Sequence, residues 1–234
     1  MTETAEKFGG SRLRPVDGVL FFGRRPWPTG GTCGENRNFR PCFEPAFAPK
    51  PAVGNGPFPY SEMALAIRPL VVFPDPRLRL VAAPVTAFDA DLRALADDLL
   101  DTLRAAPGIG ITAPHVGVAA RVVVLDLGSG DPDPGHPVRI LVNPRILALS
   151  GTPVSHAEGS ISMPGISEEV ERPAHVRVAY QDLTGAAHEV EADGLLGVCL
   201  QHEIDQLDGL FWLQRLSRLK RDRAVKRFAK INGR

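Results

Sequence analysis

The part of the sequence that decides the fold reads Ala-Asp-Gly-Leu-Leu-Gly-Val-Cys-Leu-Gln-His-Glu-Ile-Asp-Gln over residues 192–206. Its apolar residues and the glycine that follows predict a helix ending near residue 208. Positions i and i+4 share one helix face, so His202 and Gln206 lie together, with Glu203 beside them. In the H-E-x-x-H pattern, two histidines at these positions hold a metal ion and the glutamate acts on its bound water. With Gln206 in the second position, this pattern alone is a weak signal.

Two further stretches accompany it: Gly108-Ile-Gly-Ile-Thr-Ala-Pro-His-Val-Gly117 and Glu158-Gly-Ser-Ile-Ser162. In order and spacing, the three stretches resemble the motifs of peptide deformylases, usually written GxGxAAPQ, EGCLS and QHExDH. Shorter segments match as well, such as PDPRLR at 75–80 and GISEEVERP at 165–173. The resemblance extends over residues 63–230.

The resemblance implies an α+β fold with antiparallel or mixed sheets around a central helix that carries the His-Glu-x-x-Gln segment, followed by a basic C-terminal helix. It implies an enzyme that hydrolyses the formyl group from the N-terminal formyl-methionine of new polypeptides. It also implies a divalent metal cofactor, iron(II) or zinc, held by one cysteine and two histidines.

Transferred position by position, the resemblance makes His202 a metal ligand and Glu203 the general acid and base. Ser160 occupies the position of the cysteine ligand, and Gln206 that of the second histidine ligand. His115 replaces a glutamine that helps to hold the reacting carbonyl group, and the backbone N–H of Ile161 is a second donor to that carbonyl. The residues expected to contact the substrate are Ile109, Gly110, Gly159 and Leu196.

The two replaced ligands predict weak or absent activity. A serine hydroxyl stays neutral where a metal-bound thiolate is anionic, and an amide oxygen suits hard ions such as calcium. Structural zinc sites contribute ~10–16 kcal/mol through four ligands, so losing two good donors weakens binding by several kcal/mol. Without metal, the water facing Glu203 keeps its high pKa.

Three alternatives to a standard deformylase remain open. A rebuilt metal site could use His115 with His202 and Ser160 or Gln206. A non-catalytic protein could still bind formyl-methionine ends through its apolar pocket. A serine hydrolase based on Ser160 is disfavoured, because Glu-Gly-Ser-Ile-Ser lacks the second glycine of G-x-S-x-G and no histidine–acid pair to activate the serine is evident.

The whole chain has balanced charge, with 27 basic and 27 acidic residues among 234, so DNA and anionic membranes are not expected partners. No apolar run approaches a membrane span, and three cysteines form no disulfide framework, so we expect a cytoplasmic protein. Residues 1–62 are rich in proline and glycine, and we expect either a disordered extension or a mis-assigned start, with Met63 beginning a domain over 63–234. Cys33 and Cys42 in this segment lack partners for a metal site.

The remaining pattern predicts helices over about 89–105, 193–208 and 215–230, and strands at 121–127, 138–142, 174–181 and 187–192. Hairpin turns rather than βαβ units join these strands, which also favours an α+β domain. From Arg215 to Arg234 nine residues are basic and one, Asp222, is acidic. Such a helix could bind the ribosome through RNA phosphates, as bacterial deformylases are thought to do, or could be a solvated face packed on the domain.

Overall fold

The structure, a computed structural model, describes residues 67–106, 108–128 and 137–233. Its helices are α1 (Ala90–Ala105), α2 (Gly194–Leu207) and α3 (Arg218–Ile231), with short 3-10 helices η1 (Pro76–Arg79), η2 (Ala113–Val116) and η3 (Trp212–Arg215). Its strands are β1 (Gly110–Thr112), β2 (Val122–Leu125), β3 (Arg139–Gly159), β4 (Ser167–Gln181) and β5 (Ala187–Ala192). The predicted α+β class is confirmed. The predicted extension over 1–62 lies outside the described residues.

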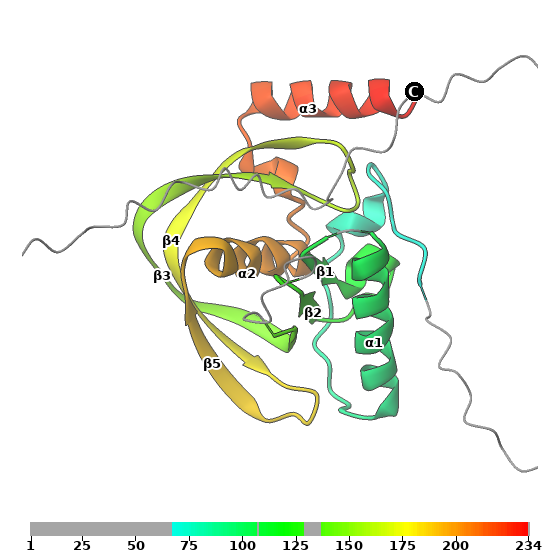
Figure 1. Cartoon of the computed structure of the whole chain (residues 1–234), viewed down its shortest axis with the longest axis vertical. Coiled ribbons are helices and arrows are strands. Elements are labelled where there is room, and N and C mark those ends of the chain that lie inside the picture. Colours follow the sequence, from blue (N-terminus) through cyan, green and yellow to red (C-terminus); the bar gives the residue numbers. More distant parts are fainter. Residues whose placement is uncertain (1–66, 107, 129–136, 234) are drawn as a thin grey trace, which may run out of the picture.

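The five strands form one antiparallel sheet in the order β1-β2-β3-β4-β5, with α2 inside its curve (Figure 1). β3 and β4 make a long bent hairpin around α2, while α1 packs beside β1 and β2. The buried side of α2 contacts the sheet through a cluster that includes Leu200, Ile204 and Val178. Enclosure by the sheet explains why every residue of α2 from Gly197 to Leu207 is buried.

Two helices begin or end where the sequence predicts. At the start of α1, the Asp89 side chain accepts hydrogen bonds from the N–H groups of Asp91 and Leu92, both at 3.1 Å. After α2, Gly209 has φ of 77°, and a Cβ there would lie 2.6 Å from the carbonyl oxygen of Arg79. Only glycine fits such a left-handed turn in so close an approach to backbone.

The long hairpin is where the sequence prediction falls short. The strands expected at 138–142 and 174–181 are only the paired ends of β3 and β4, which continue to Gly159 and back to Ser167. Register shifts interrupt β3 three times, and its residues 148–155 are exposed. The period-2 alternation that reveals a half-buried strand is therefore absent there. β1 is also missing from the prediction, because three residues are too few to show a period.

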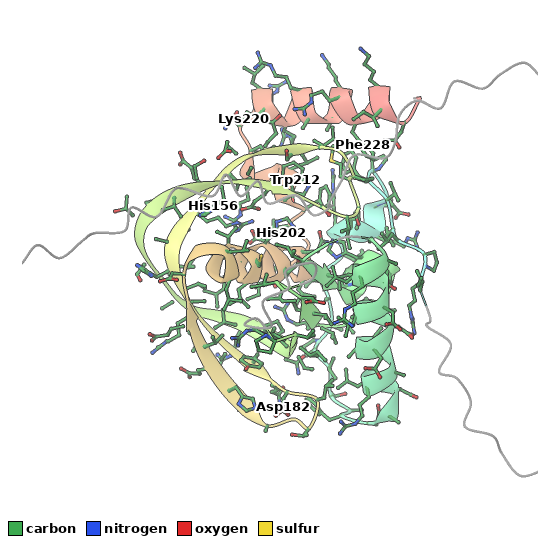
Figure 2. All side chains as sticks on the ribbon, in the orientation of Figure 1. His156, Asp182, His202, Trp212, Lys220 and Phe228 are labelled. Atoms are coloured by element: carbon green, nitrogen blue, oxygen red, sulfur yellow. The ribbon has the colours of Figure 1, made fainter. Side chains whose placement is uncertain are left out.

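Helix α3 starts three residues later than predicted, since η3 precedes it and Ser217 caps it by accepting the N–H of Lys220. Ala224 and Phe228 pack on a cluster that contains Phe73 and Trp212 (Figure 2). No helix in the described ranges is long and apolar enough to cross a membrane.

Candidate active site

Helix α2 holds the central residues of the site inside the sheet. His202, Glu203 and Gln206 are 4%, 0% and 1% exposed. They share the site with the end of β3 and with β1, because Ile161 packs against Gly108 and the Glu203 carboxylate lies beside Gly110. The three stretches quoted from the sequence therefore meet in space.

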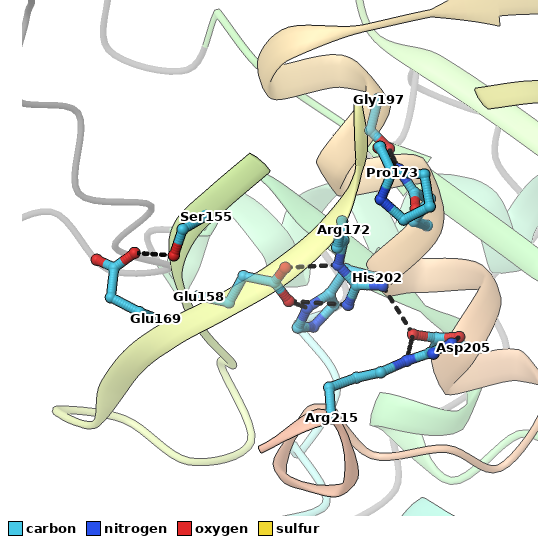
Figure 3. A network of polar contacts seen from close by, with 10 residues as sticks. Ser155, Glu158, Glu169, Arg172, Pro173, Gly197, His202, Asp205 and Arg215 are labelled. Carbon is cyan, nitrogen blue, oxygen red and sulfur yellow. Dashed lines mark hydrogen bonds and ion pairs between the residues drawn. The ribbon is translucent and has the colours of Figure 1, made fainter. Parts of the chain in front are cut away.

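A buried ionic chain orients His202 (Figure 3). Glu158 Oε2 lies 2.8 Å from His202 Nδ1, and Arg172 donates to both Glu158 oxygens at 2.5 and 2.9 Å. Burial alone would raise the pKa of Glu158, but hydrogen bonds from His202 and Arg172 outweigh it and lower that pKa to about 2. The ionised Glu158 accepts a hydrogen bond from Nδ1–H, so the pair fixes both the tautomer and the ring plane of His202.

This series of buried ion pairs continues toward the surface. Arg172 Nη1 donates to Asp205 Oδ2 at 2.8 Å, and Arg215 from η3 closes the other side of Asp205 with a bond to each oxygen. Glu158, Arg172 and Asp205 all have side chains no more than 6% exposed. The sequence analysis missed Arg172, Asp205 and Arg215. Arg172 lies two residues after Val170 on the buried face of β4, and a buried arginine needs acidic partners.

The side chains at both replaced ligand positions make hydrogen bonds to the protein's own backbone. Ser160 Oγ accepts the N–H of Ser162 at 3.1 Å. Gln206 Nε2 donates to the carbonyl oxygen of Leu78 at 2.7 Å, tying α2 to η1. Each side chain therefore has a structural partner of its own.

His115 has a defined tautomer. Its Nδ1 lies 3.0 Å from the N–H of Thr112 and 2.9 Å from the Thr112 hydroxyl. A backbone N–H can only donate, so Nδ1 is the acceptor and the proton of the neutral ring is on Nε2. Burial, together with the charge of nearby His202, lowers the pKa of His115 to about 3 and agrees with a neutral ring. The Nε2–H is fully buried and has no partner among the described residues.

Glu203 is a buried acid without hydrogen bonds. Neither of its oxygens has a partner among the described residues, and a Cβ on Gly110 would lie 2.4 Å from Oε1. Burial raises the pKa of Glu203 to about 7. A small residue at position 110 is thus required by the Glu203 carboxylate itself.

The predicted substrate residues are divided between the site and the core. Gly110 opens β1, and Gly159 closes β3 at a point where a Cβ would lie 2.8 Å from the carbonyl oxygen of Ile166. Ile109 is half-buried between two core clusters. Leu196 packs in the core between α2 and the sheet, lining a small apolar recess with Leu141, Tyr180, Val190 and Leu200. Its contact with substrate stays a prediction.

Comparison with known proteins shows to which family the chain belongs. A family model described as polypeptide deformylase matches residues 67–222. A Brucella suis protein named peptide deformylase-like is 58% identical over 167 residues, which cover 71% of this chain and 99% of the relative. The chain belongs to the peptide deformylase family. A second Brucella suis protein, named peptide deformylase, is 45% identical over 168 residues, covering 71% and 94%.

Solved peptide deformylases share the fold. The crystal structure of the enzyme from Legionella pneumophila is 38% identical, covers 71% of this chain and 96% of its own, and superposes with a TM-score of 0.66. The predicted family is therefore confirmed by both sequence and structure.

The donor set at the family's metal position does not fit iron(II) or zinc. Among its three residues only His202 is a good ligand for these ions, while Ser160 and Gln206 offer neutral oxygens. In the described parts of the chain, no group of three or more histidine, cysteine, aspartate or glutamate side chains is placed to hold a metal ion.

Replacement of Glu203 by glutamine should remove a pH dependence of stability. The carboxyl ionises near pH 4.5 when unfolded and near pH 7 when folded, so its contribution is fully present below about 4.5 and is lost as pH rises to about 7. We expect the free energy of unfolding of the wild type to lose about 3 kcal/mol over this range, relative to Glu203→Gln. Urea unfolding at pH 5 and pH 8 in EDTA measures the difference. An identical pH dependence in the two proteins would contradict a protonated, buried Glu203, and the exposed Glu171→Gln serves as the matched control.

Proposed function

We propose that this chain is a deformylase-family protein that binds the formyl-methionine end of new polypeptides and hydrolyses it weakly or not at all. The observation that supports this most strongly is the buried, unpartnered Nε2–H of His115. A buried donor without an acceptor is costly, and a carbonyl oxygen of a bound peptide would satisfy it. His115 thus offers the kind of hydrogen bond that a glutamine amide offers in the motif it replaces.

The replaced ligands support the second half of the proposal. A metal ion would require Ser160 and Gln206 to leave their bonds to Ser162 and Leu78. In return they would supply only weak ligands for iron(II) or zinc. Loss of the metal removes the reactive water before it removes apolar contacts with the substrate, so binding can persist without turnover.

A rebuilt metal site through His115 has a specific obstacle. The lone pair of His115 Nδ1 accepts the N–H of Thr112, and Nε2 carries the proton. Coordination through Nε2 would need the other tautomer and would leave the Thr112 N–H without its acceptor. The geometry therefore favours His115 as a hydrogen-bond donor to a carbonyl group over His115 as a metal ligand.

The two Brucella suis relatives suggest how reduced activity is tolerated. One organism has both a peptide deformylase-like protein and a peptide deformylase, and this chain shares more sequence with the former. By the same reasoning, we propose that this chain acts beside a separate deformylase in its own cell.

Hydrolysis and binding of the tripeptide formyl-Met-Ala-Ser test the proposed function. Under anaerobic conditions with iron(II), nickel(II) or zinc(II), we expect no turnover above that of Glu203→Ala. In EDTA, calorimetry should show binding that weakens about tenfold in His115→Ala, the loss expected for one hydrogen bond to a carbonyl. Efficient metal-dependent turnover that is lost in Glu203→Ala would contradict the proposal. If His115→Ala also abolished that turnover, the rebuilt metal site would be the better account.

The basic helix α3 offers a surface for the ribosome. Lys220 and Arg227 are occupied by the Glu169 carbonyl and the Glu168 carboxylate of β4. The exposed residues Arg223, Lys226 and Lys230 have no ion pair within the described ranges and face away from the domain. They are spaced to contact successive phosphates of RNA along one helix face.

Charge reversal on this face should weaken binding to ribosomes. We expect the triple variant R223E/K226E/K230E to co-sediment with ribosomes at least about tenfold less well than wild type at low salt, because it loses three phosphate contacts. The variant R93E/R145E/R177E makes the same change of charge at exposed sites away from α3 and should behave as wild type. Equal co-sedimentation of all three proteins would argue against docking through α3.

A further inference from the structure

A groove of about 500 Å³ lies between the residues around η1, the short helix η3 and one side of α3. Its volume is within the range of sites that hold small molecules. Figure 1 shows that α3 lies outside the β3–β4 hairpin, whereas α2 with the candidate active site lies inside it. The groove is therefore separate from the site described above.

The floor of the groove is apolar. Its side chains belong to one core cluster or pack against it, and they are Phe73, Phe211, Leu213 and Val225. The rings of Phe73 and Phe211 stack with centroids 5.6 Å apart, and the ring of Phe228 meets Phe73 edge-on at 6.0 Å. These contacts hold the rings in place, so a ligand finds the floor already formed and need not order it.

Three cations border this floor, and none of them forms an ion pair with another described residue. They are Arg79 of η1 and Arg221 and Lys226 of α3. Arg227, on the same helix, is by contrast paired with Glu168 at 2.8 Å. Because like charges around one groove repel each other, an anion bound among them is stabilised.

We propose that this groove binds the anion of a medium-chain fatty acid, with the alkyl chain on the floor and the carboxylate at Arg79, Arg221 and Lys226. Such a ligand matches both the apolar and the charged part of the groove. A purely apolar molecule would leave the cations without an anion, and an inorganic anion would leave the floor in contact with water. Arginine also has the fork of N–H donors that a carboxylate accepts in pairs.

Asp222 favours a ligand with a single negative charge. It lines the groove next to Arg221, and its ion pair with Arg218 is long, at 3.9 Å, and exposed. A second charge on the ligand, as on a phosphate monoester, would be repelled by this carboxylate. The floor combines aromatic rings with the branched side chains of Leu213 and Val225, and a flexible alkyl chain fills such an uneven surface better than a rigid ring does.

This inference does not rest on the proposed peptide binding. The groove is lined by none of His115, His202 and Glu203. Of its three cations, only Lys226 also belongs to the face of α3 proposed for the ribosome. A fatty acid in the groove and a formyl-methionine peptide in the active site should therefore bind without competing.

Calorimetric titration of the full chain with sodium octanoate tests the inference. We expect one site with a dissociation constant below about 1 mM. Octanol lacks the charge and acetate lacks the chain, so each should bind at least about tenfold more weakly. Octyl phosphate should also bind more weakly than octanoate, because of its second charge. Saturation with formyl-Met-Ala-Ser should leave the affinity for octanoate unchanged.

Two variants test the location of the site. Arg221→Gln keeps a long polar side chain without the charge and should weaken octanoate binding about tenfold. Val225→Phe places a larger side chain in the groove and should weaken it at least as much. The matched control is Arg93→Gln, which removes an exposed arginine of α1 and should bind as wild type does. Circular dichroism on each sample confirms that the variant folds.

Folded wild-type protein that does not bind octanoate would overturn the inference. Equal affinity in wild type, Arg221→Gln and Val225→Phe would also overturn it, because the ligand would then lie elsewhere. Equal affinity for octanoate and octanol would show that the cations take no part, and tighter binding of octyl phosphate would contradict the carboxylate. Displacement of octanoate by the formyl peptide would place it in the active site, so failure of this inference is distinguishable from failure of the proposed function.

Discussion

The ion pair between Arg172 and Glu158 is the interaction on which the rest of the site depends. Both side chains are almost completely buried, and the arginine is shared with Asp205 while the glutamate is shared with His202. Two buried carboxylates would be costly without this cation, and the cation would be costly without them. The arrangement is stable only if β3, β4 and α2 keep their relative positions. The same contacts that hold the hairpin around the helix therefore hold His202 in one orientation.

Under the proposed function, this dependence allows the framework to persist while the chemistry changes. Glu158, Arg172 and Asp205 are fixed by one another and by burial, so replacing a ligand at Ser160 or Gln206 leaves them satisfied. Gln206 ties α2 to the carbonyl of Leu78. His202 keeps its orienting acid, and His115 keeps a proton on the nitrogen without a partner. The site thus holds an oriented histidine and a buried hydrogen-bond donor.

The sequence predicted the family, the fold class and the helices around α1 and α2, because amphipathic spacing and cap residues are local signals. Most of the long hairpin was missed, since residues 148–155 are exposed and the bulges of β3 break its alternation. In the site, the positions of His202, Glu203 and Ser160 were predictable from the motifs. The partners of Glu158 were not, because Arg172 and His202 lie 14 and 44 residues from it in the sequence. The tautomer of His115 could not be predicted from the sequence either, because it depends on the direction of the Thr112 N–H.

The affinity for zinc(II) shows whether Ser160 and Gln206 stand in place of working metal ligands. Competition with a chromogenic chelator gives the dissociation constant for the wild type and for the double variant Ser160→Cys/Gln206→His. We expect the variant to bind at least about a thousand times more tightly, because it regains a thiolate and an imidazole beside His202. A wild-type protein that binds zinc(II) as tightly as the variant would contradict this expectation and would show that the residues now present make a metal site of their own.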